Sequence, residues 1–388
     1  YWVGGNDRRI NLFENIFPVP RGVSYNYYII NDEKTVLMDT VDYAIGREFI
    51  ENVTHVLNGR TLDYIVVNHM EPDHCATIGD LVLRYPNVKI IGNAKTFQYI
   101  KQFYGDLKFE AVTVKEGDTL NTGKHTLHFV NAPMVHWPEV MMVYEESTGT
   151  LFSADAFGTF GALDGTVFAD EVDFDRDWLD DARRYYTNIV GKYGVQVQAV
   201  LKKAAALDIK IICPLHGPIW RENLEYIIDK YNKWSSYEPE EKGVMIAYAS
   251  MYGNTENAAN VLANMLAEKG VRKIRVYDVS VTHVSQLVSE SFKYSNIVIA
   301  APTYNGAVYP IMENYITDIK ALNLQNRKVA VIDNGTWAVT AGKLISKEIS
   351  EMKNMTVLDK TFSIKSAVSY DQIDELNEFA DMIIESMK

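Results

Sequence analysis

The sequence predicts two domains of mixed structure: an α+β domain with layered mixed sheets, then an α/β domain with a doubly wound parallel sheet. Short strand-like runs separated by turns fill the first half, whereas strands and helices alternate regularly in the second. The polar segment Ser235–Gly243, which contains a Pro and a Gly, separates them. A chain of 388 residues with 47% hydrophobic residues can build two cores, because single cores stop growing near ~250–300 residues. We therefore expect domains over residues 1–237 and 244–388, joined by a linker over 238–243.

In the first domain, short runs rich in β-branched and aromatic residues predict the strands of the sheets. Thr148–Gly149 is typical of a hairpin turn between two of these runs. The expected strands cover residues 27–30, 35–38, 64–67, 89–91, 126–130, 141–144, 150–152 and 209–212, and the expected helices cover 76–84 and 178–192.

The second domain alternates apolar strands with amphipathic helices. Strands this apolar are typical of a parallel sheet that helices cover on both faces. The expected strands cover residues 244–249, 274–279, 297–301, 329–332 and 356–362, and the expected helices cover 256–269, 284–292, 312–321, 341–352 and 371–387.

Bulk composition excludes several classes of protein. A net charge of -13 provides no basic surface for nucleic acid. No apolar run approaches the ~20 residues needed to span a bilayer, so we expect no membrane segment. Cys75 and Cys213 are too few for a disulfide framework, which favours a cytoplasmic location.

Seven candidate metal ligands stand out in the first 216 residues, all at or near predicted strand ends. In an extended segment alternate residues share a face, so His69, Glu71 and Asp73 should project together after the strand ending at Val67. The turn into the next helix would aim His74 at a neighbouring position. The other three candidates each follow a strand: His136, Asp155 and His216.

The number and chemistry of these ligands indicate two adjacent metal ions. A single zinc takes three or four protein ligands, so seven are too many for one ion. Two ions roughly 3.5–4 Å apart that share one carboxylate would use them all. Imidazoles and carboxylates without thiolates suit iron or manganese, although ligand chemistry alone leaves hydrolysis and redox chemistry both open. The remaining histidines, His55, His125, His128 and His283, are expected to be ordinary surface or core residues.

Three loops after predicted strands of the second domain are candidates for one phosphate-containing ligand. Small and hydroxyl residues at a strand-to-helix junction let backbone N–H groups surround a phosphate, and Ser250 and Thr255 add hydroxyl donors. The first loop is neither a Walker loop nor a Gly-x-Gly-x-x-Gly motif. The candidate residues are Ser250, Met251, Tyr252, Gly253, Asn254 and Thr255, then Pro302, Thr303, Tyr304, Asn305 and Gly306, then Asn334, Gly335, Thr336 and Trp337.

The run His-x-Glu-x-Asp-His, followed by His136, Asp155 and His216, resembles the flavodiiron proteins, also called A-type flavoproteins. The resemblance implies a metallo-β-lactamase-like αββα sandwich followed by a flavodoxin-like domain that binds FMN at the three loops. Most hydrolases of the first fold have a histidine where this chain has Glu71, a hard oxygen ligand that favours iron over zinc. By resemblance, one iron, nearer the flavin, is bound by His69, Glu71 and His136. The other is bound by Asp73, His74 and His216, and Asp155 bridges the two.

The resemblance also implies an activity and partners. The expected reaction is the reduction of O2 to water, of NO to N2O, or of both, with electrons relayed through FMN. The chain has no Cys-x-x-Cys pair for a fused rubredoxin, so we expect an external donor, by resemblance rubredoxin or, less often, a reduced deazaflavin coenzyme. The family implies a head-to-tail homodimer, or a dimer of dimers, that places one subunit's FMN beside its partner's irons. Further candidates to line the pocket are Arg21, Tyr25 and Trp137.

Two alternatives belong to other classes. The first is a zinc hydrolase of metallo-β-lactamase type that carries a flavodoxin domain, which metal analysis would distinguish. The second is a flavodoxin-like electron carrier whose first domain is only structural; replacing His69 or His136 would then remove metal without affecting its redox partnership.

Overall fold

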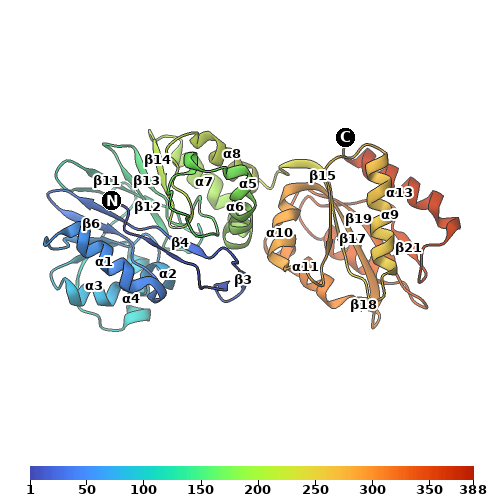
Figure 1. Cartoon of the computed structure of the whole chain (residues 1–388), viewed down its shortest axis with the longest axis horizontal. Helices are drawn as coiled ribbons and strands as arrows, with labels where there is room; N and C mark the ends of the chain where they lie inside the picture. The colour runs from blue at the N-terminus through green and yellow to red at the C-terminus, as the bar shows by residue number, and fades with distance from the viewer. The chain divides into compact units, whose positions relative to one another are not determined.

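The computed structural model describes residues 1–388, which divide into two compact units (Figure 1). The first comprises residues 1–186 and 195–232, and the second comprises 187–194 and 233–388. None of the helices combines the length and the apolar character needed to cross a membrane. The first unit contains mixed sheets and the second a parallel sheet, which confirms both predicted fold classes.

Two five-stranded sheets form the centre of the first unit. One has the order β5 (Tyr28–Asn31), β6 (Thr35–Met38), β7 (Tyr64–Val66), β8 (Lys89–Gly92) and β9 (Glu110–Thr113). The other has the order β10 (Thr119–Asn121), β11 (Thr126–Asn131), β12 (Met141–Glu145), β13 (Thr150–Phe152) and β14 (Ile211–Cys213). Two small ribbons add β1 (Gly5–Asp7) with β4 (Val23–Tyr25), and β2 (Leu12–Phe13) with β3 (Phe17–Pro18).

The two sheets pack face to face. Val36 and Val66 from one sheet share a buried cluster with Phe129 and Val143 from the other, as the inner faces of a sandwich must. In Figure 1 helices α1, α3 and α4 gather at one side of this unit and α6, α7 and α8 at the other, which gives the αββα arrangement. The helices are α1 (Gly46–Leu57), α2 (Pro72–Cys75), α3 (Ile78–Arg84), α4 (Ala94–Tyr104), α5 (Phe174–Asp177), α6 (Leu179–Tyr185), α7 (Gly194–Ala204) and α8 (Leu224–Ser235).

The second unit contains a sheet of order β16-β15-β17-β19-β20, all parallel, with β21 also paired to β19 and β18 to β17. Its strands are β15 (Glu241–Tyr248), β16 (Ile274–Asp278), β17 (Tyr294–Tyr304), β18 (Ala307–Val308), β19 (Lys328–Asn334), β20 (Thr356–Val357) and β21 (Phe362–Ile364). Its helices are α9 (Asn254–Glu268), α10 (Val284–Lys293), α11 (Pro310–Ala321), α12 (Ala341–Ser350) and α13 (Ile373–Ser386).

Alternate residues of β15 enter the two cores of this unit. Ile246 packs in the cluster that contains residues of α9 and α13, whereas Ala247 packs in the cluster that contains residues of α10, α11 and α12. Helices therefore cover both faces of the sheet, which explains why its strands are apolar throughout.

Two predicted elements are interrupted in the structure. The helix expected over 178–192 ends at Tyr185 and continues as a π-helical turn, Tyr186–Val190, and a 3-10 turn, Gly191–Tyr193. The β-branched residues of this stretch and Gly191 are weak helix formers. The strand expected over 356–362 is two strands, β20 and β21, because Asp359 and Lys360 between them are poor strand formers.

A buried arginine holds several chain segments of the second unit together. The guanidinium of Arg327 is 1% exposed and donates to the carbonyls of Tyr237 at 2.7 Å, Ser291 at 2.9 Å and Phe292 at 2.6 Å. Burial lowers the pKa of Arg327 to about 9, so it remains charged at neutral pH.

We expect Arg327→Met to destabilise the protein by about 3–5 kcal/mol, because the carbonyls lose a charged donor. Denaturant unfolding would measure this, with the exposed neighbour Lys328→Met as control; equal stabilities would contradict it.

A carboxylate in the β12–β13 hairpin should make stability depend on pH. Burial would raise the pKa of Glu145, but hydrogen bonds from the hydroxyls and backbone N–H groups of Ser147 and Thr148 outweigh it and lower that pKa to about 2. Because the folded pKa lies below the unfolded value, this stability is present above about pH 4.5 and is lost as pH falls towards 2. At pH 6 we expect Glu145→Gln to unfold more easily than the wild type by roughly 1–3 kcal/mol.

Unfolding of the Glu145→Gln variant at a series of pH values measures this prediction. The stability difference from wild type should shrink as pH falls from 6 to 3. Glu146→Gln is the matched control, since Glu146 is 65% exposed. A difference that stayed constant with pH would contradict the account.

Candidate metal centre and flavin pocket

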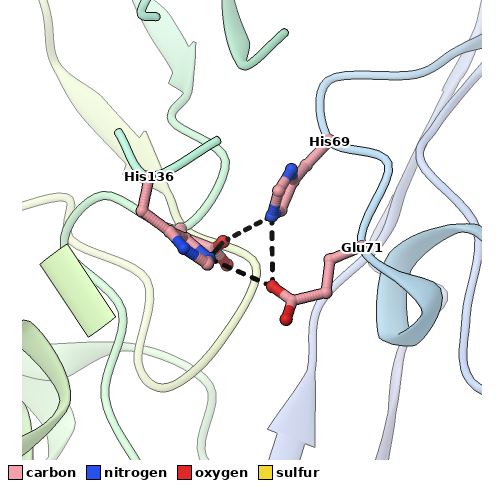
Figure 2. A group of neighbouring side chains, drawn as sticks. His69, Glu71 and His136 are labelled. Atoms are coloured by element: carbon pink, nitrogen blue, oxygen red, sulfur yellow. Dashed lines mark hydrogen bonds and ion pairs between the residues drawn. The ribbon is translucent and has the colours of Figure 1, made fainter. Parts of the chain in front are cut away.

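Four of the predicted ligands meet in one buried cluster. His69 follows β7, Glu71 precedes α2, His136 lies between β11 and β12, and Asp155 follows β13. Nε2 of His69 lies 3.2 Å and Nε2 of His136 lies 3.0 Å from the same Glu71 oxygen. Both nitrogens are 3.3 Å from Oδ2 of Asp155. Figure 2 shows the imidazoles and the Glu71 carboxylate pointing toward one another. These four residues are called the first cluster.

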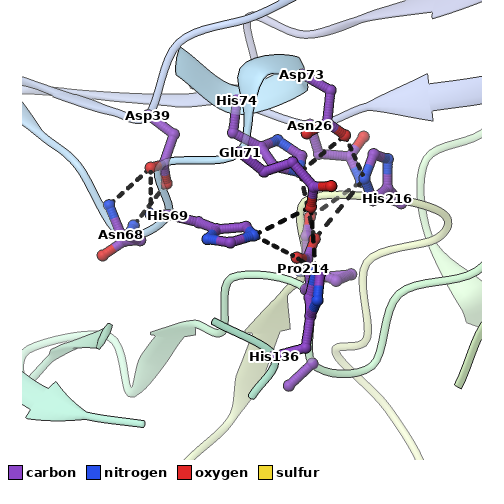
Figure 3. A network of polar contacts seen from close by, with 12 residues as sticks. Asn26, Asp39, Asn68, His69, Glu71, Asp73, His74, His136, Pro214 and His216 are labelled. Atoms are coloured by element: carbon purple, nitrogen blue, oxygen red, sulfur yellow. Dashed lines mark hydrogen bonds and ion pairs between the residues drawn. The ribbon is translucent and has the colours of Figure 1, made fainter. Parts of the chain in front are cut away.

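The other three predicted ligands form the second cluster, Asp73, His74 and His216 (Figure 3). Nε2 of His74 is 3.1 Å and Nε2 of His216 is 3.3 Å from Oδ2 of Asp73. Oδ1 of Asp155 lies 3.3 Å from His74 and 3.7 Å from His216. Asp155 therefore contacts the first cluster through one oxygen and the second through the other.

The expectation that Asp73 would share a face with His69 and Glu71 is wrong. The extended segment stops at Glu71, because Pro72 begins helix α2 with a backbone angle already suited to a helix. Asp73 and His74 are consecutive residues of α2 and both join the second cluster.

The donor atoms are placed to bind metal ions, because several of them have no hydrogen-bond partner in the protein. Within each cluster they lie within 4.8 Å of one another. Both oxygens of Asp73 and Asp155 and Nε2 of His74 and His216 are buried without a hydrogen-bond partner. Leaving such groups unpartnered is costly, and buried charges are normally paired or bind metals. An oxygen and nitrogen donor set of this kind suits two iron ions.

Electrostatics within the clusters also favour cations. Burial alone would lower the pKa of His136, but Asp155 and Glu71 raise it to about 9. Burial would likewise raise the pKa of Asp155, but the imidazoles of His74 and His69 hold it well below its ordinary value. Without metal, Asp155 thus stays anionic and His136 carries a proton, so a proton stands in for a cation that this site accommodates.

The outer nitrogens of three of the four imidazoles have partners that the sequence reasoning missed. Nδ1 of His69 donates to Oε1 of Glu139 at 2.8 Å, and Nδ1 of His216 donates to the Ser24 carbonyl at 2.8 Å. Nδ1 of His74 lies 3.0 Å from the hydroxyl of Tyr27. These contacts orient the rings so that each Nε2 faces its cluster. Only Glu139 carried a usable signal, an acidic residue directly before the apolar run of β12.

Two further buried residues, Asp39 and Asn26, support the ligand loops (Figure 3). Asp39, which is fully buried, accepts from the backbone N–H of Asn68 at 2.7 Å and from that of His69 at 3.2 Å. Asn26 donates to the carbonyls of Pro214 at 3.1 Å and Gly217 at 2.7 Å, on either side of His216. The ligand loops are therefore held by buried polar contacts as well as by the strands they follow.

Aromatic rings surround the histidines. The rings of Phe13, Tyr25 and Tyr185 lie 5.4, 5.4 and 5.6 Å from that of His216. The Trp137 ring lies 5.3 Å from that of His69. Of the three candidates for the pocket lining, Tyr25 and Trp137 thus contact ligands. Arg21 instead lies over the Trp178 ring, at 4.4 Å, and pairs with Asp181.

The three loops of the second unit surround a cavity of 420 Å³. It lies at the carboxyl ends of β15, β17 and β19, where doubly wound sheets bind their ligands. All the candidate residues line it except Gly253, whose φ of 87° makes the turn into α9. Ala338 and Ser366 line it in addition. Ser366 donates from its N–H to Asn334 at 3.0 Å; it was missed because it follows β21, outside the loops considered.

A buried pair of oxygen and nitrogen clusters in one unit, and a flavodoxin-type cavity in the other, define an oxidoreductase that uses metal ions and a flavin. Family models agree: residues 23–217 match the ODP family beta lactamase and residues 245–384 match a flavodoxin domain. The anaerobic nitric oxide reductase flavorubredoxin of Escherichia coli is 30% identical to this chain; the match covers 90% of this chain and 74% of that protein.

Two solved structures agree with this chain over nearly all of their length. Rubredoxin oxygen:oxidoreductase from Desulfovibrio gigas superposes with a TM-score of 0.93 at 26% identity, covering 100% of this chain and 96% of its own. The flavodiiron protein from Giardia intestinalis also gives a TM-score of 0.93, at 25% identity, covering 100% of this chain and 95% of its own. The chain belongs to the flavodiiron protein family, and its cofactors are FMN and two iron ions.

Proposed function

We propose that this protein reduces O2 to water or NO to N2O at its two irons, with electrons relayed through FMN from an external donor. The observation that carries the proposal is the pair of buried donor clusters joined by the two oxygens of Asp155. The proposed ligands are His69, Glu71 and His136 for the iron nearer the flavin, Asp73, His74 and His216 for the other iron, and Asp155 as the bridge.

The chemistry of the ligands supports a redox centre. Glu71 and Asp73 each give one cluster its own hard anionic oxygen, and Asp155 supplies a third carboxylate shared by both. Together they offset much of the charge of two divalent ions. When bound to these residues, two ferrous ions would provide electrons for the reduction of a small diatomic substrate, and FMN bound in the second unit would provide electrons to the irons.

The surroundings of the clusters suit a small apolar gas. His69, His74 and His216 are fully buried, and the rings of Phe13, Tyr25 and Trp137 pack around them. Such a wall limits water near the ligands, which favours a small apolar substrate. The names of relatives support both gases: one is called a nitric oxide reductase and another an oxygen oxidoreductase.

For the flavin, we propose that the loop from Ser250 to Thr255 binds the FMN phosphate at the start of α9. The exposed rings of Tyr252 and Trp337, which border the cavity, are proposed to contact the isoalloxazine. The loops 302–306 and 334–337 supply the remaining contacts.

We further propose rubredoxin as the external donor, a head-to-tail homodimer or a dimer of such dimers, and a cytoplasmic location. The name of the Desulfovibrio gigas relative supports the donor. The two cysteines are free and buried, which supports a reducing compartment.

Mixing an iron-deficient subunit with a flavin-deficient subunit tests the head-to-tail dimer. A proven heterodimer of the two should regain activity, and a heterodimer without activity would exclude this arrangement.

Parallel steady-state assays test the reaction itself. The iron- and FMN-loaded protein is supplied with reduced rubredoxin and either O2 or NO, the NO assay being strictly anaerobic. We expect consumption of at least one gas, and the ratio of the two rates assigns the substrate. A protein that contained both cofactors and consumed neither gas would overturn the proposal.

A further inference from the structure

The two clusters have nearly the same ligands but different surroundings. Each contains two imidazoles and one carboxylate of its own, and each contacts one oxygen of Asp155. Their histidines differ in what the outer nitrogen contacts. In the second cluster the partners are neutral, the Tyr27 hydroxyl for His74 and the Ser24 carbonyl for His216. In the first cluster the partner of His69 is a carboxylate, Glu139.

Glu139 is placed to act on His69 and on little else. Its side chain is 0% exposed. Oε1 accepts from Nδ1 of His69 and from the backbone N–H of Met70, both at 2.8 Å. Oε2 is buried without a hydrogen-bond partner. The carboxylate is therefore buried against a single imidazole, and a charge acts strongly where water is excluded.

We propose that Glu139 is a positioning residue that makes the two iron sites unequal, so that the iron bound by His69 is held more tightly and is harder to reduce than its neighbour. The inference rests on the ligand assignment proposed above. A hydrogen bond from Nδ1 fixes the tautomer that leaves Nε2 of His69 free to bind metal. An anionic acceptor also makes the imidazole of His69 a stronger electron donor to the metal. A stronger ligand stabilises the more highly charged ferric ion.

Glu139→Gln separates charge from position. The amide oxygen can accept both hydrogen bonds that Oε1 accepts, so the ring of His69 keeps its orientation while the negative charge is lost. Glu139→Asp keeps the charge but shortens the side chain. The matched control at the second cluster is Tyr27→Phe, which removes the hydroxyl beside Nδ1 of His74 and changes no charge.

Metal affinity provides the first readout. Full-length apoprotein is titrated with Fe²⁺ against a chelator of known affinity, without oxygen. We expect two ions in every variant. In Glu139→Gln one ion should bind roughly 10–100-fold more weakly, the range usual for removing such a partner, while the other is unchanged. In Tyr27→Phe the other ion should bind more weakly, and its affinity should fall by a smaller factor.

Reduction potentials provide the second readout, one that a purely structural role would not move. In a titration of the iron-loaded protein followed by Mössbauer and EPR spectroscopy, the lower of the two iron potentials should rise in Glu139→Gln. It should stay nearer the wild-type value in Glu139→Asp. If Glu139→Gln did not fold, the comparison would be between Glu139→Asp and Tyr27→Phe. The proposal would be supported if the lower of the two iron potentials were the same in these two variants. It would be overturned if that potential were far higher in Glu139→Asp than in Tyr27→Phe.

The outcomes separate this inference from the proposed function. Wild-type protein that takes up two ions, together with a Glu139→Gln variant of unchanged affinity and potentials, would overturn the role of Glu139 alone. Wild-type protein that failed to bind two ions would overturn the ligand assignment and this inference with it.

Discussion

Replacement of Asp155 by alanine should remove both irons and abolish gas reduction while FMN stays bound. Each oxygen of Asp155 contacts a different cluster, at 3.3 Å from His69 and 3.3 Å from His74, so its loss leaves both clusters without their shared anion. The imidazoles would then face one another with less negative charge to attract a cation. We expect turnover to fall by more than about 100-fold, beyond the usual effect of removing an outer partner.

Iron and flavin analysis of the purified variant, together with the gas-consumption assay, measures this effect. Asp73→Ala is the informative comparison, because Asp73 contacts only the second cluster and its loss should release one iron. Asp164→Ala, at an 82% exposed side chain, is the control for an ordinary surface carboxylate. Two irons retained in the Asp155 variant would show that this residue does not bridge the site.

Replacement of Thr255 by aspartate should remove FMN and leave the irons in place. Thr255 lies in the first turn of α9 and lines the cavity where the FMN phosphate is proposed to bind. A carboxylate there would face that phosphate, and two like charges 4 Å apart repel by roughly 4 kcal/mol near a protein surface. We expect FMN affinity to fall by a hundredfold or more, and donor-dependent turnover to fall with it.

Thr255→Val provides the matched control for this substitution. It keeps the size and branching of the side chain and removes only one hydroxyl, so its FMN affinity should fall far less. Fluorescence titration of the apoprotein with FMN measures both affinities, and iron content shows that the first unit is intact. Equal affinities in the two variants would contradict a phosphate site at the start of α9.

Much of this architecture could be predicted because the patterns that define it are local. The apolar strands of the second unit have no polar face, which requires helices on both sides of the sheet. His69, Asp155 and His216 could be expected to meet because each follows a strand of one sandwich. The three flavin loops could be grouped for the same reason, since parallel strands bring their carboxyl ends to one edge.

The remainder depended on tertiary context. The helical turn that starts at Pro72 moved Asp73 away from the face of His69 and Glu71, although the seven candidates were the right kinds of ligand. The outer partners Ser24, Tyr27 and Glu139 are separated from their histidines by up to 192 residues, so no local pattern links them. Ser366 reaches the flavin cavity because it follows β21, which pairs with β19, and only the sheet order reveals this pairing.

The central claim is that electrons pass from FMN to a gas through the iron site. Rapid mixing of fully reduced protein with O2 or with NO, without any external donor, tests it most directly through the visible absorbance of oxidised flavin. We expect flavin reoxidation to be fast in the wild type with at least one gas, and to be slowed by more than tenfold in Asp155→Ala, whose flavin pocket is unchanged. Equal reoxidation rates in the two proteins with both gases would show that the irons are not on the path, and would contradict the account.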